Sequence, residues 1–123
     1  MAISEKARGG TVVLTPDSDI TWDNQPELKH VLDDLSEQGE KHIIIDLSRV
    51  REISVYGLGL LASRCGRLRR EHGDIRLANP SALVRRLLHV TNLDHLFEQF
   101  DSADNAVRSF TIMDSGSDPE DEE

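Results

Sequence analysis

The stretch His42-Ile-Ile-Ile-Asp-Leu-Ser48, followed by Ile53-Ser-Val-Tyr-Gly-Leu-Gly-Leu-Leu61, decides how this chain folds. Three consecutive isoleucines suit a strand that is covered on both faces, because a half-exposed strand would alternate apolar and polar residues. From about Gly57 to His72 the apolar residues recur at helical spacing. The two segments therefore predict a buried strand that leads through a short loop into an amphipathic helix.

Strands and helices continue to alternate on both sides of this unit. The expected strands are Ala2–Ala7, Thr11–Leu14, His42–Leu47, Ile75–Ala78 and Phe97–Phe100. The expected helices are Asp23–Gln38, Gly57–His72, a helix capped by Asn79 that runs to about His89, and a last helix capped by Ser102. This order predicts an α/β fold with a mixed β-sheet of about five strands and about four helices, parallel wherever a helix connects two strands.

Composition indicates one soluble domain. The chain has 123 residues, of which 37% are hydrophobic and 30% are charged. Apolar runs such as Ile43–Ile45 are far shorter than the roughly 20 residues that cross a bilayer, and no signal-like segment begins the chain, so we expect a cytoplasmic protein without membrane insertion. Cys65 is the only cysteine, and its place on the apolar side of a helix predicts a small buried residue.

Negative charge is concentrated at the carboxyl terminus. The formal net charge is -9, and six acidic residues lie in the last ten positions, which leaves a net charge of -3 for the rest. These six residues are Asp114, Asp118, Glu120, Asp121, Glu122 and Glu123. The balance argues against nucleic-acid binding, which requires a basic surface. We expect a folded domain over residues 1–113 and a disordered acidic tail over Asp114–Glu123.

Together with the later segment Asn79–Phe97, the two stretches quoted above resemble the STAS domain family, named for sulphate transporters and anti-sigma-factor antagonists. The resemblance covers about Thr11–Phe110 and implies a STAS-like sheet. It is strongest to the bacterial anti-sigma-factor antagonists, or anti-anti-sigma factors. It implies a non-enzymatic module of signalling and transcription regulation that binds an anti-sigma factor with a histidine-kinase-like ATPase fold.

The loop before the second helix departs from the pattern of that family. The family usually has Asp-Ser-Ser-Gly or Asp-Ser-Thr-Gly, and the residue before the glycine is phosphorylated by the partner. Here the matching residues are Ser54, Val55, Tyr56 and Gly57. Tyr56 stands at the acceptor position, but a kinase site shaped for a short hydroxyl would not reach a phenolic oxygen in the same geometry. We expect Tyr56 to stay unmodified and keep Ser54 as the substitute acceptor.

The same resemblance places the partner-binding surface on this loop and on the loop that contains Asp19. The predicted contact residues are Asp19, Ser54, Val55, Tyr56, Gly57, Leu58 and Gly59. Tyr56 has two readings of equal weight, a contact residue or a ring packed over the loop. A weak homodimer is a further alternative for the oligomeric state.

Two other functions are carried as alternatives. One is a STAS subunit of a stress-sensing assembly or of a lipid-transport ATPase complex. The other, of a different class, is a nucleotide-binding protein, but Gly57-Leu58-Gly59 lacks the third glycine and the lysine of phosphate-binding loops. The five histidines show no ligand or catalytic spacing, so we expect no enzyme activity, no cofactor and no metal.

Overall fold

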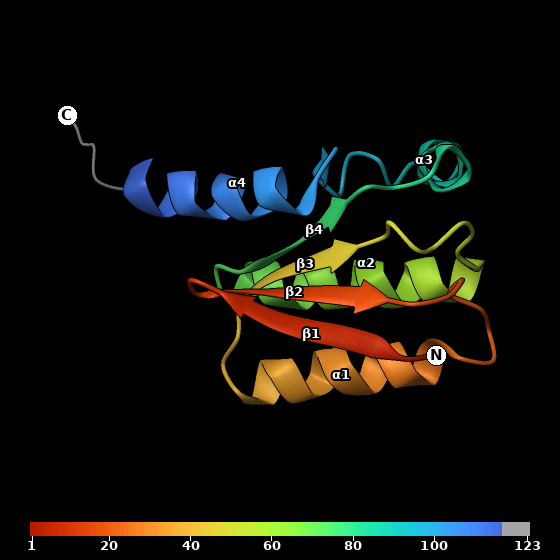
Figure 1. Cartoon of the computed structure of the whole chain (residues 1–123), viewed down its shortest axis with the longest axis horizontal. Coiled ribbons are helices and arrows are strands. Elements are labelled where there is room, and N and C mark those ends of the chain that lie inside the picture. The colour runs from red at the N-terminus through yellow and green to blue at the C-terminus, as the bar shows by residue number, and fades with distance from the viewer. Residues whose placement is uncertain (117–123) are drawn as a thin grey trace.

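A computed structural model of the chain describes residues 1–116 and shows a five-stranded sheet with four helices (Figure 1). The elements in chain order are β1 (Ile3–Arg8), β2 (Thr11–Pro16), α1 (Gln25–Glu37), β3 (His42–Asp46), α2 (Val55–Arg70), β4 (Asp74–Ala78), α3 (Ala82–Val90), β5 (Gln99–Phe100) and α4 (Ala103–Gly116). The strands lie side by side in the order β1-β2-β3-β4-β5, and only the β1–β2 pair is antiparallel. The predicted α/β class and mixed sheet are confirmed.

The antiparallel pair depends on a two-residue turn. Gly9 and Gly10 have φ angles of 56° and 83°, which glycine adopts without the penalty that a Cβ atom brings. The turn places Arg8 opposite Thr11 and carries the register to Ile3 opposite Pro16. The hairpin therefore adds an outer strand to a sheet that is otherwise built from helix-connected parallel strands.

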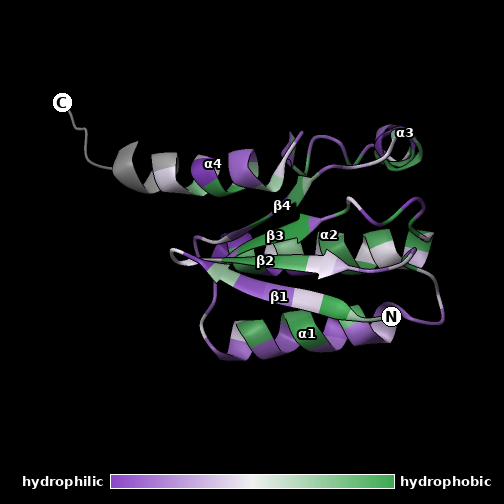
Figure 2. Ribbon diagram, viewed as in Figure 1, coloured by the Kyte–Doolittle hydropathy of each residue, from purple (hydrophilic) through white to green (hydrophobic). Residues whose placement is uncertain are grey.

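The consecutive isoleucines of β3 serve two separate cores, as the sequence predicted. Ile43 and Ile45 belong to the larger cluster, together with apolar residues of α1, α2 and α3. Ile44 belongs to a smaller cluster on the other face, which α4 covers. Figure 2 shows the hydrophobic sides of α1 and α2 turned toward the sheet, with α4 on the opposite side of it. All three isoleucines are at most 1% exposed.

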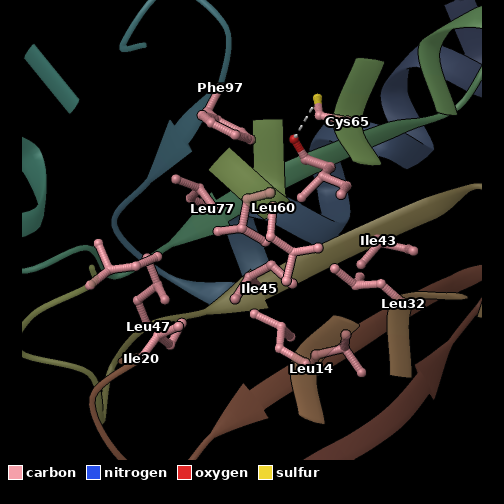
Figure 3. Close-up of a cluster of buried hydrophobic side chains, with 14 of the residues drawn as sticks. Leu14, Ile20, Leu32, Ile43, Ile45, Leu47, Leu60, Cys65, Leu77 and Phe97 are labelled. Carbon is pink, nitrogen blue, oxygen red and sulfur yellow. Dashed lines mark hydrogen bonds between the residues drawn. The ribbon is translucent and has the colours of Figure 1, made fainter. Parts of the chain in front are cut away.

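The larger core is mostly aliphatic, includes the Phe97 ring and contains Cys65 (Figure 3). The Cys65 side chain is fully buried, and its Sγ donates a hydrogen bond to Asp74 Oδ1 over 3.3 Å. Burial raises the pKa of the Cys65 thiol to about 11, so at neutral pH it is protonated and a poor nucleophile. The prediction of a small buried residue is confirmed.

The smaller core is organised around Phe110 of α4. Its ring stacks on the His42 imidazole at 4.5 Å between centroids, with an interplanar angle of 11°. The guanidinium carbon of Arg76 lies 4.0 Å from the centre of the same ring. Arg76 is only 2% exposed and donates hydrogen bonds to Asp74 Oδ2 and Ser109 Oγ at 3.0 and 2.7 Å. The smaller core is therefore held both by buried apolar side chains and by the ring contacts and hydrogen bonds of Arg76.

Several element boundaries differ from the expected ones. Ser81, not Asn79, caps α3, because its Oγ accepts a hydrogen bond from the Val84 N–H at 3.1 Å. Asn79 has a φ of 55° and donates from its side-chain amide to Asp46 Oδ1 instead. The last strand is shorter than expected, because Phe97 leaves the sheet edge and is buried in the larger core.

The last helix extends past the residue where the tail was expected to begin. Helix α4 continues to Gly116, so the expected boundary after Met113 lies within the helix. The remainder of the predicted tail, residues 117–123, lies outside the described residues. None of the helices described in residues 1–116 combines the length and hydrophobicity needed to cross a membrane.

Candidate functional site

Two loops that follow parallel strands meet at one edge of the sheet. The Ile20 N–H donates to the Glu52 carbonyl at 3.1 Å, and the Ser54 N–H donates to the Ile20 carbonyl at 2.8 Å. Ile20 and Ile53 thus form a parallel bridge beyond the named strands, and both side chains are buried. The loop after β2 and the loop before α2 are therefore fixed to each other, although more than 30 residues separate them.

Asp19 strengthens this connection. Its Oδ1 accepts hydrogen bonds from the backbone N–H groups of Arg51 and Glu52 at 2.7 and 3.2 Å. Its Oδ2 also lies 3.8 Å from the Arg51 guanidinium, and 29% of the side chain is exposed. Asp19 was predicted as a partner contact. The structure gives it a role in shaping the loop and leaves one side of the carboxylate open to solvent.

Ser54 begins helix α2 as its N-cap. Its φ and ψ of -73° and 161° are extended, and its Oγ accepts a hydrogen bond from the Gly57 N–H at 3.0 Å. Gly57 packs tightly beneath it, since an added Cβ would lie 2.8 Å from Ile20 Cγ2 and 3.0 Å from Ile53 Cγ1. Glycine therefore permits a close approach at position 57, whereas Gly59 faces open space.

The first turn of α2 presents its apolar residues unevenly. Val55 and Tyr56 are 69% and 64% exposed, whereas Leu58 is 1% exposed and belongs to the core. Leu58 and Gly57 were both predicted as contact residues; both are buried in the free chain, and their contact with a partner stays a prediction. Tyr56, the other exposed residue of this turn, has an aromatic neighbour. Its ring meets the Trp22 ring edge to face at 6.5 Å with an interplanar angle of 69°.

Exposed apolar side chains are gathered around this edge. In the part of the chain that the structure describes, five large hydrophobic side chains are exposed: Trp22, Val55, Tyr56, Leu83 and Val90. Val55 and Leu83 line one hollow of about 310 Å³, with Ile53 and Leu87 in its wall. Leu83, Leu87 and Val90 follow each other at helical spacing on α3. We call the surface formed by the five residues and Leu87 the apolar strip.

The strip has a more polar hollow at its Trp22 end. That hollow has a volume of about 180 Å³ and shares the segment Glu52–Ser54 with the apolar one. Its other walls come from the loop Asp19–Trp22. The segment before α2 is therefore a ridge with a depression on either side, which is a shape suited to binding a protein surface.

Sequence analysis missed the residues at both ends of the strip. Trp22 is the only tryptophan of the chain and lies between polar residues in a loop, which is an unusual place for a large aromatic side chain. On α3, Val84 and Leu88 are the buried residues, so the apolar side chains of Leu83 and Val90 are not needed to fill the core. Both signals were present in the sequence, and neither was used.

The histidine and carboxyl groups are the other candidates for chemistry in the described residues. Within residues 1–116 no group of three His, Cys, Asp or Glu side chains is arranged to hold a metal ion. His89 Nδ1 lies 2.9 Å from Asp94 Oδ2, and this contact lowers the pKa of the Asp94 carboxyl. The His89 side chain of this pair is 80% exposed, and that of Asp94 is 26% exposed. What the edge of the sheet offers is a shaped apolar contact surface.

Comparison with known proteins gives consistent results. The STAS domain family matches residues 2–106. A Thermotoga neapolitana protein, named provisionally as an anti-sigma factor antagonist, is 28% identical over 97 residues, which cover 78% of this chain and 86% of that protein.

Solved structures share the architecture. A crystal structure from Thermotoga maritima, with the same provisional name, superposes with a TM-score of 0.82 at 26% identity and covers 87% of this chain and 92% of that chain. The Bacillus anti-sigma factor antagonist SpoIIAA, in its unphosphorylated form, superposes with a TM-score of 0.78. It is 20% identical, covers 89% of this chain and 96% of its own, and shows the likeness of fold alone.

Proposed function

Because the chain belongs to the STAS domain family, we propose that it is a non-enzymatic regulatory module of the anti-sigma-factor-antagonist type that acts in the cytoplasm. Its output is the capture of a protein partner, an anti-sigma factor with a histidine-kinase-like ATPase fold, which releases a sigma factor. The observation that carries the proposal is the position of the apolar strip. Exposed Trp22, Val55 and Tyr56 surround the loop where this family meets its partners.

We further propose that capture is not switched off by phosphorylation of this loop. In related antagonists a phosphoryl group would add about -1.5 to -2 charges at the contact surface. Here the acceptor position carries Tyr56, whose ring extends outward to Trp22. Ser54 is the remaining short hydroxyl, and its Oγ is engaged as the acceptor that caps α2. Modification of Ser54 would have to compete with this capping role.

The test begins with affinity capture from native cells by the tagged full chain. Wild type, Tyr56→Ala and Arg70→Ala are compared, because Arg70 is exposed at the opposite end of the same helix. We expect wild type and Arg70→Ala to retain an ATPase of the histidine-kinase-like class, and Tyr56→Ala to lose it. If all three proteins retained that ATPase equally, the strip would not be part of the interface.

Phosphorylation is tested on the same material. The captured complex is incubated with and without ATP, and the intact mass of the bait is measured. An unchanged mass of the bait would support an antagonist whose binding is not switched off by phosphorylation. An added phosphate that disappears in Ser54→Ala, but persists in Tyr56→Phe, would contradict the proposal and assign the switch to Ser54.

The two alternatives predict different results in these experiments. A subunit of a stress-sensing assembly or of a lipid-transport ATPase would be recovered with a multi-domain scaffold or a transporter. A nucleotide-binding protein would retain nucleotide after purification, which is measured by chromatography of the denatured supernatant. Either result would displace the anti-sigma factor as the partner.

A further inference from the structure

The two ends of the apolar strip carry opposite charges. Asp23 is exposed directly beside Trp22, and Arg86 is exposed on α3 between Leu83 and Val90. In residues 1–116, neither side chain forms an ion pair. Arg85, which precedes Arg86 in the chain, pairs with Asp101 at 3.2 Å. The strip therefore runs from a free carboxylate to a free guanidinium.

The outer face of α3 extends the strip away from the family loop. Leu83, Leu87 and Val90 lie at positions i, i+4 and i+7 of this helix, and Arg86 lies beside them. Val84 and Leu88 already anchor α3 in the core. Leu83 and Val90 are thus exposed beyond the core in the described part of the chain, whereas Leu87 between them is partly buried and packs against it. Large exposed apolar patches on soluble proteins usually mark contact surfaces.

We propose that a second copy of this chain covers the strip in a symmetric dimer. A two-fold axis through the middle of the strip, near Val55 and Tyr56, lays one strip antiparallel on the other. Each acidic end then meets a basic end, so that Asp23 of one copy lies opposite Arg86 of the other, twice. The ends of the strip are complementary in charge, and its middle carries the apolar side chains of Val55 and Tyr56 beside exposed Glu52, so an isologous contact pairs its opposite ends.

This dimer is weak and depends on ionic strength. The strip is small for a permanent interface, so the dissociation constant falls in the micromolar range or above. Two copies that each carry a net charge of -9 repel one another at long range. At about 0.15 M salt the Debye length is about 8 Å, which screens this repulsion while leaving close pairs across the interface effective.

Self-association would also regulate the proposed function. Val55 and Tyr56 cannot contact a second copy and an anti-sigma factor at the same time, so the dimer would hold the contact surface covered until a partner competes for it. This consequence alone rests on the proposed function. The dimer itself is a property of the isolated chain, and failure to find an anti-sigma factor would leave it unaffected.

A charge exchange tests the proposed pairing. Sedimentation equilibrium of the full chain across micromolar concentrations should show the average mass of wild type rising toward twice the monomer mass. Asp23→Arg and Arg86→Asp should each weaken the dimer by about tenfold or more, because each creates two like-charge contacts. The double variant Asp23→Arg/Arg86→Asp should restore association, since the opposite charges then meet again.

Trp22 provides an independent signal, because it is the only tryptophan of the chain. Its 63% exposed side chain should shift its emission to shorter wavelength as the dimer forms, in wild type and in the double variant but in neither single variant. Far-UV circular dichroism confirms that the exposed substitutions leave the fold intact. A wild-type chain that remains monomeric would overturn the inference and leave the strip to a different protein. A double variant that remains monomeric would overturn it as well.

Discussion

The chain uses its aromatic residues in two opposite ways. Phe110 is 2% exposed and enclosed between the His42 ring and the Arg76 guanidinium. Trp22 and Tyr56 are 63% and 64% exposed, and the only aromatic contact of each within the described chain is with the other. Burial and partners indicate that Phe110 holds α4 to the sheet. The exposed pair contributes little to the fold, and we propose its apolar surface for contacts between proteins.

The largest expected effect is on the buried side of this comparison. Phe110→Ala removes the ring from the smaller core and should cost about 3–5 kcal/mol of unfolding free energy, measured by urea denaturation. Phe110→Leu, which keeps much of the volume but loses the ring contacts with His42 and Arg76, should cost less. If Phe110→Ala left the unfolding free energy nearly unchanged, α4 would not be needed to stabilise the sheet.

The second comparison is between the serines that cap α2, beside the strip, and α4, on the buried side. Ser54 caps α2 beside the strip, and Ser102 caps α4 through a hydrogen bond from the Asn105 N–H at 3.0 Å. Replacement of either by alanine should cost about 1 kcal/mol. Only Ser54→Ala should also weaken partner capture, because it loosens the first turn that carries Tyr56. Equal effects of the two variants on capture would show that general stability is being measured.

Acid titration probes an ion pair on the aliphatic side of the sheet. Arg64 Nε donates to Asp33 Oδ1 at 2.8 Å, and this hydrogen bond holds the pKa of the Asp33 carboxyl below its ordinary value of 3.8. A carboxyl with a lowered pKa in the folded state stabilises the protein above its ordinary pKa, and the contribution is lost as the pH falls through the lowered value. Asp33→Asn should therefore flatten the acid limb of the stability curve.

The expected contribution of this pair is about 0.5 kcal/mol, because the carboxylate is partly exposed. Glu37→Gln, an exposed substitution on the same helix, provides the control. The measurement is the free energy of unfolding as a function of pH. An acid limb as steep in Asp33→Asn as in wild type would show that other carboxyl groups determine the acid sensitivity.

The smallest effect on stability should come from the exposed pair. Tyr56→Ala and Trp22→Ala should each change the unfolding free energy by less than about 0.5 kcal/mol, since their rings lose little contact with the folded chain. Thermal unfolding followed by circular dichroism is the measurement. If either variant lost as much unfolding free energy as Phe110→Ala, the two aromatic regions would not differ in this respect, and the exposed pair would stabilise the fold.

The pattern of apolar residues was sufficient to predict the fold, because a strand that is buried on both faces is apolar at consecutive positions. Ile43, Ile44 and Ile45 read as a doubly covered strand, and the two cores confirm it. Local chemistry was less certain where two capping residues competed. Asn79 and Ser81 are both good caps, and only the hydrogen bond from Asn79 to Asp46, distant in sequence, leaves Ser81 to begin α3.

The candidate site was predictable only in part. The family resemblance located the loop around Ser54 and Tyr56, but it could not tell which residues of that loop face outward. Leu58 turns inward because it lies on the same side of α2 as the buried residues Leu61 and Cys65. Leu83 joins Val55 through the packing of α3 against the loop, a contact between segments far apart in the chain. Pattern within one helix does not contain that information.

The bridge between Ile20 and Ile53, reinforced by the Asp19 carboxylate, has a kinetic consequence. Both loops are already ordered in the free protein, so association need not pay the entropy of arranging them. A partner would then dock at a rate set by diffusion and orientation, and substitutions within the surface would act mainly through the lifetime of the complex. Asp19→Asn should be the exception, because a weaker link between the loops would slow the encounter itself.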